Sequence, residues 1–431
     1  MILFQPALDL ERNTFAHILG KWFEPIFGRQ LNYGLQLRWK ASSMKKSIFL
    51  CLMVASVSAY AQKFDGLALT PPMGWNSWNT FATNVNEDLI KTVADAMIKN
   101  GMRDAGYNYI VIDDGWEAAQ RDSSGTIIPD PGKFPHGMKV LGDYLHLHGF
   151  KFGLHNCAGT ETCAGLPGGR GHEYHDAMTY ASWGVDYLKY DWCNHGMANA
   201  EETYKTMRDA LYHAGRPVVF SICEWGNDEP WIWGAKIGHL WRTTGDITDC
   251  YDCQDVYAMG WKYILDKEAE LTQYAGPDHW NDPDMLEVGA SGLTLSESRS
   301  HFSLWCMLAA PLMAGNDVRS MSSQIRDILT NKELIAIDQD SLGKQGFRFM
   351  DHPGKQIWAK ELSHGEWAVC IFNSSTDPVK VRVHWSYLSF LKGKFSIHDI
   401  WHKQDIGTSE DDYVVDIEPH DVVLLRLTPV R

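Results

Sequence analysis

A short apolar run that ends in polar or aromatic residues and is followed by a helix-like segment recurs along the chain from Phe64 onward. Eight such runs read as buried strands, at residues 73–78, 107–112, 150–154, 185–190, 217–222, 240–244, 279–280 and 311–314. Helix-like segments include 86–100, 172–183, 198–214 and 296–310, and the first of them has apolar residues at helical spacing. Strands that alternate with helices predict a parallel sheet covered on both faces.

Eight strand–helix units in roughly 280 residues predict an α/β fold, a (β/α)8 TIM barrel, which we place at residues 62–345. A doubly wound open sheet is the alternative, but no Gly-rich turn follows the first strand, and polar residues follow every strand. From residue 346 the pattern changes to short alternating runs, at 356–360, 367–372, 379–383, 413–417 and 422–427. Residues 346–431 are therefore expected to form a C-terminal antiparallel β-sandwich.

The N-terminal region contains a pattern typical of a secretory signal peptide. Residues 44–46 are Met-Lys-Lys, a short apolar core follows, and residues 59–61 read Ala-Tyr-Ala, an A-x-A cleavage site. We expect a signal peptide at 44–61, an upstream extension at 1–43, and a mature chain that starts at Gln62 and is periplasmic or extracellular. A buried apolar segment is the alternative. Export implies an oxidising compartment, in which disulfides persist.

Charge and composition exclude several classes of partner. With 39 Lys+Arg against 54 Asp+Glu the net charge is −15, and there is no basic block, so nucleic acid is not an expected partner. No apolar stretch reaches the roughly 18 residues that a membrane-spanning helix needs. The sequence has no HExxH, no Walker A loop and no clustered His/Cys spacing, so no metal and no cofactor are expected. The oligomeric state stays open.

Acidic and tryptophan side chains gather where the predicted strands end, which is where a TIM barrel carries its chemistry. The carboxylates there are Asp113, Asp114, Asp191, Glu224, Asp246, Asp282 and Asp284, and the tryptophans are Trp78, Trp116, Trp192, Trp225, Trp241 and Trp280. Carboxylates bind sugar hydroxyls and supply nucleophiles and acids, and indole faces pack on the apolar face of a sugar ring. This set indicates a glycoside hydrolase with two catalytic carboxylates. Core packing explains Trp192 and Trp225 equally well, and a helix cap or an arginine partner explains Asp282.

Seven segments, in order, are similar to motifs of glycoside hydrolase family 27, the α-galactosidases, of the bacterial secreted type. They are TPPMGWNSWN at 70–79, DDGW at 113–116, TCAG at 162–165, LKYDWC at 188–193, CEWG at 223–226, WRTTGDI at 241–247 and WNDPDML at 280–286. The resemblance covers roughly residues 64–346. It implies a retaining exo-glycosidase that releases terminal α-linked D-galactose from oligosaccharides or polysaccharides.

The resemblance assigns the two catalytic carboxylates. Asp191 takes the position of the nucleophile and Asp246 that of the acid/base. Retention requires the two carboxyl groups to lie about 5–5.5 Å apart. We expect a raised pKa for Asp246 and an ionised Asp191, kept charged by Lys189 two residues earlier on the same side of the strand.

The same resemblance implies the contacts to the sugar. The expected substrate-binding residues are Trp78, Asp113, Asp114, His155, Cys163, Lys189, Trp192, Glu224, Arg242 and Asp284. The aspartate pair at 113–114 matches the residues that hold the galactose 4- and 6-hydroxyls, and Trp78 would pack near C6. Glu224 and Arg242 match the residues at the 2-hydroxyl, although Arg242 could merely neutralise buried carboxylates. Asp284 lies near the reacting end.

One position departs from the family pattern, since His155 stands where the family usually has a tyrosine beside the sugar. An imidazole is shorter than a phenol and titrates near neutral pH, so this position leaves open which substituents the sugar carries. The family also contains β-L-arabinopyranosidases, whose sugar is galactose without C6. That activity is therefore the first alternative. A catalytically silent carbohydrate-binding protein and a metal-dependent hydrolase on the same barrel are the others.

Nine cysteines are too few for a disulfide scaffold but enough for a few bridges. The family resemblance implies a disulfide between Cys163 and Cys193, next to the nucleophile. Cys250 and Cys253 form either a local disulfide or free thiols. The cysteines at 157, 223, 306 and 370 are most simply buried thiols, although Cys223 could find a partner in the loop that follows it.

Overall fold

The computed structural model describes residues 63–430. The expected extension at 1–43 and the expected signal peptide at 44–61 lie outside the described residues. Within 63–430, no helix is both long and apolar enough to span a bilayer.

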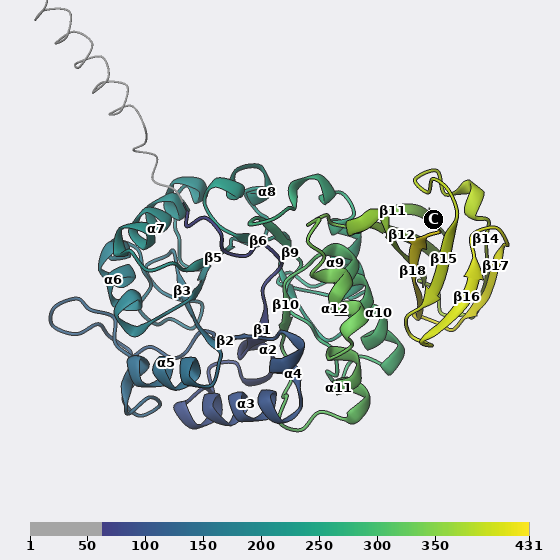
Figure 1. The fold of residues 1–431 in the computed structure, drawn as a ribbon. Helices are drawn as coiled ribbons and strands as arrows, with labels where there is room; N and C mark the ends of the chain where they lie inside the picture. The colour runs from purple at the N-terminus through teal and green to yellow at the C-terminus, as the bar shows by residue number, and fades with distance from the viewer. Residues whose placement is uncertain (1–62, 431) are drawn as a thin grey trace, which may run out of the picture. The chain divides into compact units, whose positions relative to one another are not determined.

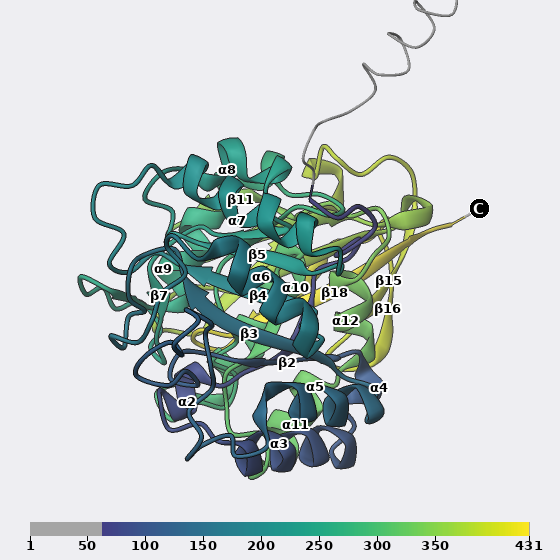
Figure 2. The ribbon, with the colours of Figure 1, turned by 90° about the vertical axis from the view of Figure 1, so that its left-hand side faces the viewer.

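All eight predicted barrel strands form, in one curled parallel sheet of order β10-β1-β2-β3-β4-β5-β6-β9 (Figures 1 and 2). They are β1 (Met73–Asn76), β2 (Tyr109–Ile112), β3 (Lys151–Cys157), β4 (Tyr187–Asp191), β5 (Val219–Cys223), β6 (Leu240–Arg242), β9 (Trp280–Asp282) and β10 (Leu312–Ala314). Leu286, just after β9, bridges Ala314 of β10 in parallel register and so closes the circle. The TIM-like barrel is confirmed, and the doubly wound sheet is excluded.

Helices cover the outside of the sheet (Figure 1). They are α2 (Trp78–Phe81), α3 (Glu87–Lys99), α4 (Met102–Ala105), α5 (Gly137–Leu147), α6 (Glu173–Trp183), α7 (Ala200–Ala214), α8 (Pro230–Trp233), α9 (Trp261–Glu268), α10 (Leu295–Leu308), α11 (Ser323–Leu329) and α12 (Lys332–Asp338). In α3, Leu89, Val93 and Met97 are buried, as their helical spacing predicts. Asn86 caps its start by accepting from the Leu89 N–H.

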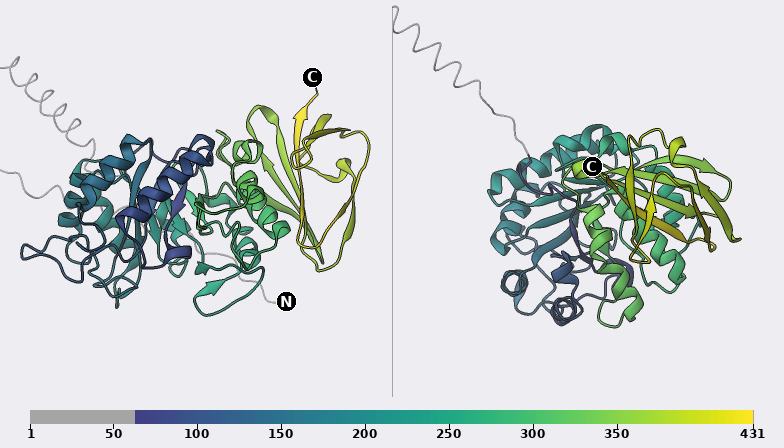
Figure 3. Two further views of the ribbon diagram at one scale, coloured as in Figure 1. Left: turned by 90° about the horizontal axis from the view of Figure 1, so that it is seen from below. Right: turned by 45° about the vertical axis from the view of Figure 1, so that its right-hand side comes forward.

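The C-terminal region is antiparallel, as predicted, and its two sheets enclose a second apolar core (Figure 3). One sheet has the order β11-β12-β13-β18-β15-β16, and the other pairs β14 with β17. The strands are β11 (Phe347–His352), β12 (Lys355–Glu361), β13 (Trp367–Asn373), β14 (Val379–Val383), β15 (Phe395–Asp399), β16 (Gln404–Thr408), β17 (Tyr413–Ile417) and β18 (Val422–Pro429). Strands β11, β15 and β16 were not predicted from the sequence.

Helix α10 joins the barrel to the sandwich. Eleven of its fourteen residues are buried, because it is covered from both sides. The Lys360 ammonium on β12 donates to the Cys306 carbonyl at 2.9 Å, and the Trp401 indole N–H donates to the Ser303 hydroxyl at 3.1 Å. The sandwich is therefore packed firmly against the helical layer behind β9 and β10.

Candidate functional site

The candidate site lies at the carboxyl ends of the barrel strands, where the sequence placed it. The alternation of side chains along strand β4 explains which of its residues face the site. Lys189 and Asp191 are two residues apart and lie on the same side of the strand. Tyr190, between them, points to the other side and packs on Tyr204 of α7. In the register of β3 and β4, His155 lies opposite Lys189. Strand pairing thus brings an imidazole, an ammonium and a carboxylate together at the floor of the site.

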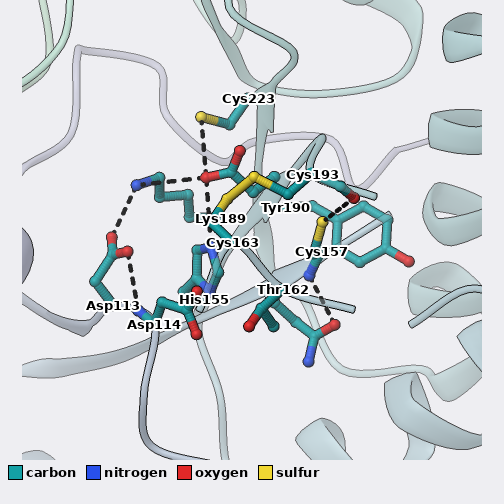
Figure 4. Close-up of polar contacts among 12 residues, drawn as sticks. Asp113, Asp114, His155, Cys157, Thr162, Cys163, Lys189, Tyr190, Cys193 and Cys223 are labelled. Atoms are coloured by element: carbon teal, nitrogen blue, oxygen red, sulfur yellow. Dashed lines mark hydrogen bonds and ion pairs between the residues drawn. A yellow bond between two sulfur atoms is a disulfide. The ribbon is translucent and has the colours of Figure 1, made fainter. Parts of the chain in front are cut away.

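Asp191 is buried and held by hydrogen-bond donors from three sides. Figure 4 labels the neighbouring side chains of His155, Lys189 and Cys223. Asp191 Oδ1 accepts from the Trp192 N–H at 2.8 Å, and its Oδ2 lies 3.4 Å from His155 Nε2 and 3.8 Å from the Lys189 ammonium. The thiol of Cys223 points at the same oxygen from 3.6 Å. Burial works to raise the pKa of Asp191, but His155 and Lys189 outweigh it and hold that pKa below the ordinary value. Asp191 is an ionised carboxylate at neutral pH.

Lys189 also binds the first of the two adjacent aspartates. Asp113 Oδ2 lies 2.9 Å from the Lys189 ammonium and accepts from the Asn76 amide at 2.8 Å. These contacts, together with His155, overcome burial and hold the pKa of Asp113 far below its ordinary value. Asp114 turns the other way, with Oδ2 accepting from the Ala164 N–H at 2.8 Å and Oδ1 buried without a partner in the described chain.

Asp246 differs from Asp191 in exposure. Its side chain is 50% exposed, and its Oδ1 lies 3.1 Å from the Arg242 guanidinium, which also contacts Asp284 at 2.9 Å. Partial burial raises the pKa of Asp246, and the negative charge of the neighbouring Asp284 raises it further. The positive charge of Arg242 lowers this pKa, but the pKa remains above the ordinary value. Arg242 also donates to the carbonyl of Gly245 at 2.6 Å. It therefore neutralises carboxylates and fixes the turn before Asp246.

Other members of the expected set surround these two carboxylates. Glu224 is buried at the end of β5, with Oε2 accepting from the Asp228 N–H at 2.7 Å and Oε1 unpartnered among the described residues. Burial raises its pKa to about 8. Cys163 and Cys193 form the expected disulfide beside Asp191. Trp192, in contrast, is stacked between His195 and Tyr204, which places its ring in the protein packing.

Two cavities meet at Asp246. One of about 610 Å³ is lined by the Cys163–Cys193 disulfide, Trp225 and the segment 256–259. The other, of about 480 Å³, is lined by Trp78 and by acidic and amide side chains that include Glu287. A half-exposed carboxyl that lines both an aromatic and a polar cavity is accessible to a saccharide.

Glu117 belongs to the site and was missed. It is buried directly behind the DDGW segment, and burial raises its pKa to about 8. One ligand atom each from Asp114, Glu117 and His155 lies within 4.8 Å of the others, so these three could hold a cation. A second such group comprises Asp191, Cys163 and Cys193, but its two thiolates are consumed by the disulfide. The sequence signal for Glu117 is its position, since it is the residue that directly follows the DDGW motif.

The structure shows which of the remaining cysteines are bonded and which are free, a question that the sequence left open. Cys250 and Cys253 are bonded to each other. The thiols at 157, 223, 306 and 370 are free and buried. Cys223 has no disulfide partner in the loop that follows it, and its thiol instead faces Asp191.

The chain resembles known proteins along almost all of the described length. A family model described as "Alpha galactosidase A" matches residues 70–340, and one described as "Alpha galactosidase C-terminal beta sandwich domain" matches 353–427. "Alpha-galactosidase A" of Cellvibrio japonicus is 49% identical over 406 residues, which are 90% of this chain and 100% of that protein. The structure of an α-galactosidase from Saccharomyces cerevisiae with raffinose has a TM-score of 0.81 at 33% identity, covering 87% of this chain and 100% of that one.

A more distant neighbour is a β-L-arabinopyranosidase of Geobacillus stearothermophilus. Its TM-score is 0.75 at 24% identity, and the match covers 84% of this chain and 98% of that one. This likeness is one of fold.

Proposed function

Because this chain belongs to the α-galactosidase family, glycoside hydrolase family 27, we propose that it releases terminal α-linked D-galactose from oligosaccharides or polysaccharides by a retaining double displacement. The observation that carries the proposal is the contrast between two carboxyl groups: Asp191 is buried and ionised, and Asp246 is half exposed with a raised pKa. A nucleophile must be charged and a general acid must hold its proton, so the two environments suit the two roles.

In the first step, Asp191 attacks the anomeric carbon while Asp246 passes its proton to the glycosidic oxygen. The bond from carbon to that oxygen breaks, and galactose stays attached to Asp191 as an ester. In the second step, Asp246, now a carboxylate, removes a proton from water. The water oxygen attacks the anomeric carbon, the ester bond breaks, and both carboxyl groups return to their starting states.

Around the ring, the polar floor of the site selects the sugar. Asp113 and Lys189, which are joined at 2.9 Å, bind the 4- and 6-hydroxyls together with Asp114. Glu224, with one oxygen already committed to the Asp228 N–H, offers the other to the 2-hydroxyl. A site that hydrogen-bonds specific hydroxyls rejects sugars that lack them, because its buried polar groups are then left unpaired.

The substrate assignment is tested with a pair of aryl glycosides. We expect p-nitrophenyl α-D-galactopyranoside to be hydrolysed with a higher kcat/KM than p-nitrophenyl β-L-arabinopyranoside, because Asp113 and Asp114 provide partners for the 6-hydroxyl that arabinose lacks. A higher kcat/KM for the arabinoside would identify the alternative activity, to which the replacement of the family's tyrosine by His155 lends some support. No hydrolysis of either would favour a silent binding protein.

The pH profile follows from the two pKa directions. Activity requires a protonated Asp246, so kcat/KM falls as pH rises through the pKa of Asp246, which lies above the ordinary 3.8. Activity also requires an ionised Asp191, so it falls on the acid side through a pKa that lies below 3.8. We therefore expect the kcat/KM profile to be bell-shaped, with an acid limb whose apparent pKa is below 3.8 and an alkaline limb whose apparent pKa is above 3.8. An alkaline limb at or below 3.8 contradicts the role of Asp246.

His155 sets the position of the acid limb. Its own burial lowers its pKa, but the carboxylates of Asp113, Asp114 and Asp191 raise it to about 9, so it is an imidazolium that donates to Asp191 at neutral pH. His155→Phe removes both the charge and the donor, and we expect the acid limb of kcat/KM to move up by about one pH unit or more. His155→Gln keeps a donor and loses the charge. If the limb moves in neither variant, His155 does not act on Asp191.

We also propose that the protein is exported. The residues at 44–61 support this through their signal-peptide pattern, and the two disulfides, Cys163–Cys193 and Cys250–Cys253, are of the kind that persists in oxidising compartments. Expression in a bacterial host, followed by fractionation and N-terminal sequencing, tests it. Gln62 is the expected first residue of the exported protein, and a cytoplasmic chain that retains residues 44–61 would contradict export.

A further inference from the structure

Three titratable side chains meet in a buried cluster next to Asp191. Asp114 and Glu117 follow strand β2, and His155 lies on β3, the neighbouring strand of the barrel. The three residues are 1%, 2% and 1% exposed, and one ligand atom from each lies within 4.8 Å of the other two. Two carboxyl groups and an imidazole are thus gathered at one point that is shielded from bulk water.

The two carboxyl groups of this cluster each have one bonded oxygen and one oxygen without a partner. Asp114 Oδ2 accepts from the Ala164 N–H at 2.8 Å, and Glu117 Oε1 accepts from the Asn156 side-chain amide at 3.3 Å. Both donors are uncharged. Asp114 Oδ1 and Glu117 Oε2 are buried and accept from no residue of the described chain. Since buried polar atoms nearly always have a partner and buried carboxylates need a nearby positive charge, these two oxygens point to a cationic ligand.

His155 repeats this pattern with its two ring nitrogens. Its Nε2 lies 3.4 Å from Asp191 Oδ2, and its Nδ1 is buried without a partner among residues 63–430. A histidine that binds a metal ion through one ring nitrogen usually donates the N–H of the other to a carboxylate, which fixes the ring and its tautomer. The contact between His155 and Asp191 has this form. All three side chains of the cluster are therefore oriented by one contact and retain one further ligand atom.

We propose that Asp114, Glu117 and His155 form a binding site for one divalent transition-metal cation, with Zn²⁺ as the probe, and that the bound cation opposes galactoside binding. Its ligand atoms are the three that have no partner in the described chain, Asp114 Oδ1, Glu117 Oε2 and His155 Nδ1. The double positive charge balances the two carboxylates. An imidazole with two carboxylates suits Zn²⁺ and Co²⁺ better than Mg²⁺ or Ca²⁺, which prefer oxygen ligands alone.

The effect on galactoside binding rests on the proposed function, in which Asp114 binds a hydroxyl of the sugar. A cation on Asp114 Oδ1 occupies this acceptor. It also replaces the Nδ1 proton of His155, so the imidazole keeps the Nε2–H that faces Asp191 but loses its positive charge. An ion can approach the cluster from the segment 163–165, because Ala164 is exposed and its N–H contacts Asp114.

Binding is measured on tag-free protein treated with a chelator, with Zn²⁺ by titration calorimetry and with Co²⁺ by visible absorption. We expect one equivalent of Zn²⁺ to bind and Co²⁺ to show the d–d bands of an ion held by the protein. Glu117→Gln and His155→Phe each remove one ligand, so each should weaken Zn²⁺ binding about 100-fold or more. Glu268→Gln is the matched control, because Glu268 is a buried glutamate of α9 outside the cluster, and it should keep the wild-type affinity.

A second measurement separates the cation site from the reaction. Asp191→Asn keeps an acceptor for His155 Nε2 and all three ligands, so this variant should bind Zn²⁺ with nearly the wild-type affinity although its catalysis is lost. In the wild-type enzyme, Zn²⁺ should raise KM for p-nitrophenyl α-D-galactopyranoside without lowering kcat, and Glu117→Gln should need about 100-fold more Zn²⁺ for the same effect.

The possible results distinguish the two parts of the proposal. If Zn²⁺ does not bind, or if Glu117→Gln and His155→Phe bind it as tightly as the wild type, the cation site is refuted. Zn²⁺ binding that leaves KM unchanged refutes the opposition to galactosides. If the wild-type enzyme hydrolyses no galactoside but the two ligand variants lose Zn²⁺, the cation site stands and the proposed function fails.

Discussion

Replacing Asp191 with asparagine is expected to lower kcat for α-galactosides by on the order of 10⁴-fold or more, because the step that forms the glycosyl-enzyme loses its nucleophile. The amide has the shape of the carboxylate and can still accept from the Trp192 N–H, which bonds Asp191 at 2.8 Å. Binding of galactose should therefore change far less than kcat. Steady-state kinetics with p-nitrophenyl α-D-galactopyranoside and the inhibition constant of galactose measure the two quantities.

A smaller side chain at the same position gives a stronger test. Asp191→Gly opens space below the anomeric carbon, so added azide can attack there and should restore turnover. A single displacement from that face gives β-galactosyl azide. Asp282→Asn is the matched control, since it removes another buried carboxylate at a strand end, and azide should not accelerate it. Full activity of Asp191→Asn, or no azide product from Asp191→Gly, would contradict the assignment.

The barrel could be predicted because its strands are buried on both faces and so appear as continuous apolar runs. The site could be predicted for a related reason: parallel strands end on one edge of the barrel, so polar residues that follow separate strands, such as Asp113 and Asp191, must converge. One of their ion-pair partners could be predicted too, because every second residue of a strand points to the same face. Lys189 and Asp191 are two residues apart and therefore lie on one face, where they form an ion pair.

What the sequence could not predict depends on contacts made far along the chain. Strand β16 is largely exposed and reads Gln-Asp-Ile-Gly-Thr, so it has no alternating apolar signal, and only its pairing with β15 makes it a strand. Glu117 lies in a loop, and its burial comes from packing near His155 on another strand. Whether Cys250 and Cys253 bond depends on how their loop folds, which the C-x-x-C spacing alone left open.

Replacing Asp246 with alanine should separate the two steps of the reaction. For substrates with poor leaving groups, such as raffinose, kcat/KM should fall on the order of 10²- to 10⁴-fold, because the leaving oxygen departs without a proton. Galactosyl fluoride needs no proton for departure, so its first step should proceed. Its second step lacks the base that activates water, and the glycosyl-enzyme should accumulate, visible as a burst of fluoride and as a mass increase of the protein. The alkaline limb assigned to Asp246 should also disappear from the kcat/KM profile.

The anomeric configuration of the azide product decides between the two carboxylates. In Asp246→Ala, Asp191 still forms the ester, so azide attacks it in a second displacement and gives α-galactosyl azide. In Asp191→Gly the single displacement gives the β product. If both variants yielded the same anomer, the two roles would not be divided between Asp191 and Asp246. Opposite anomers would show that Asp191 supplies the nucleophile and Asp246 the proton, which is the division of roles that the lowered pKa of Asp191 and the raised pKa of Asp246 support.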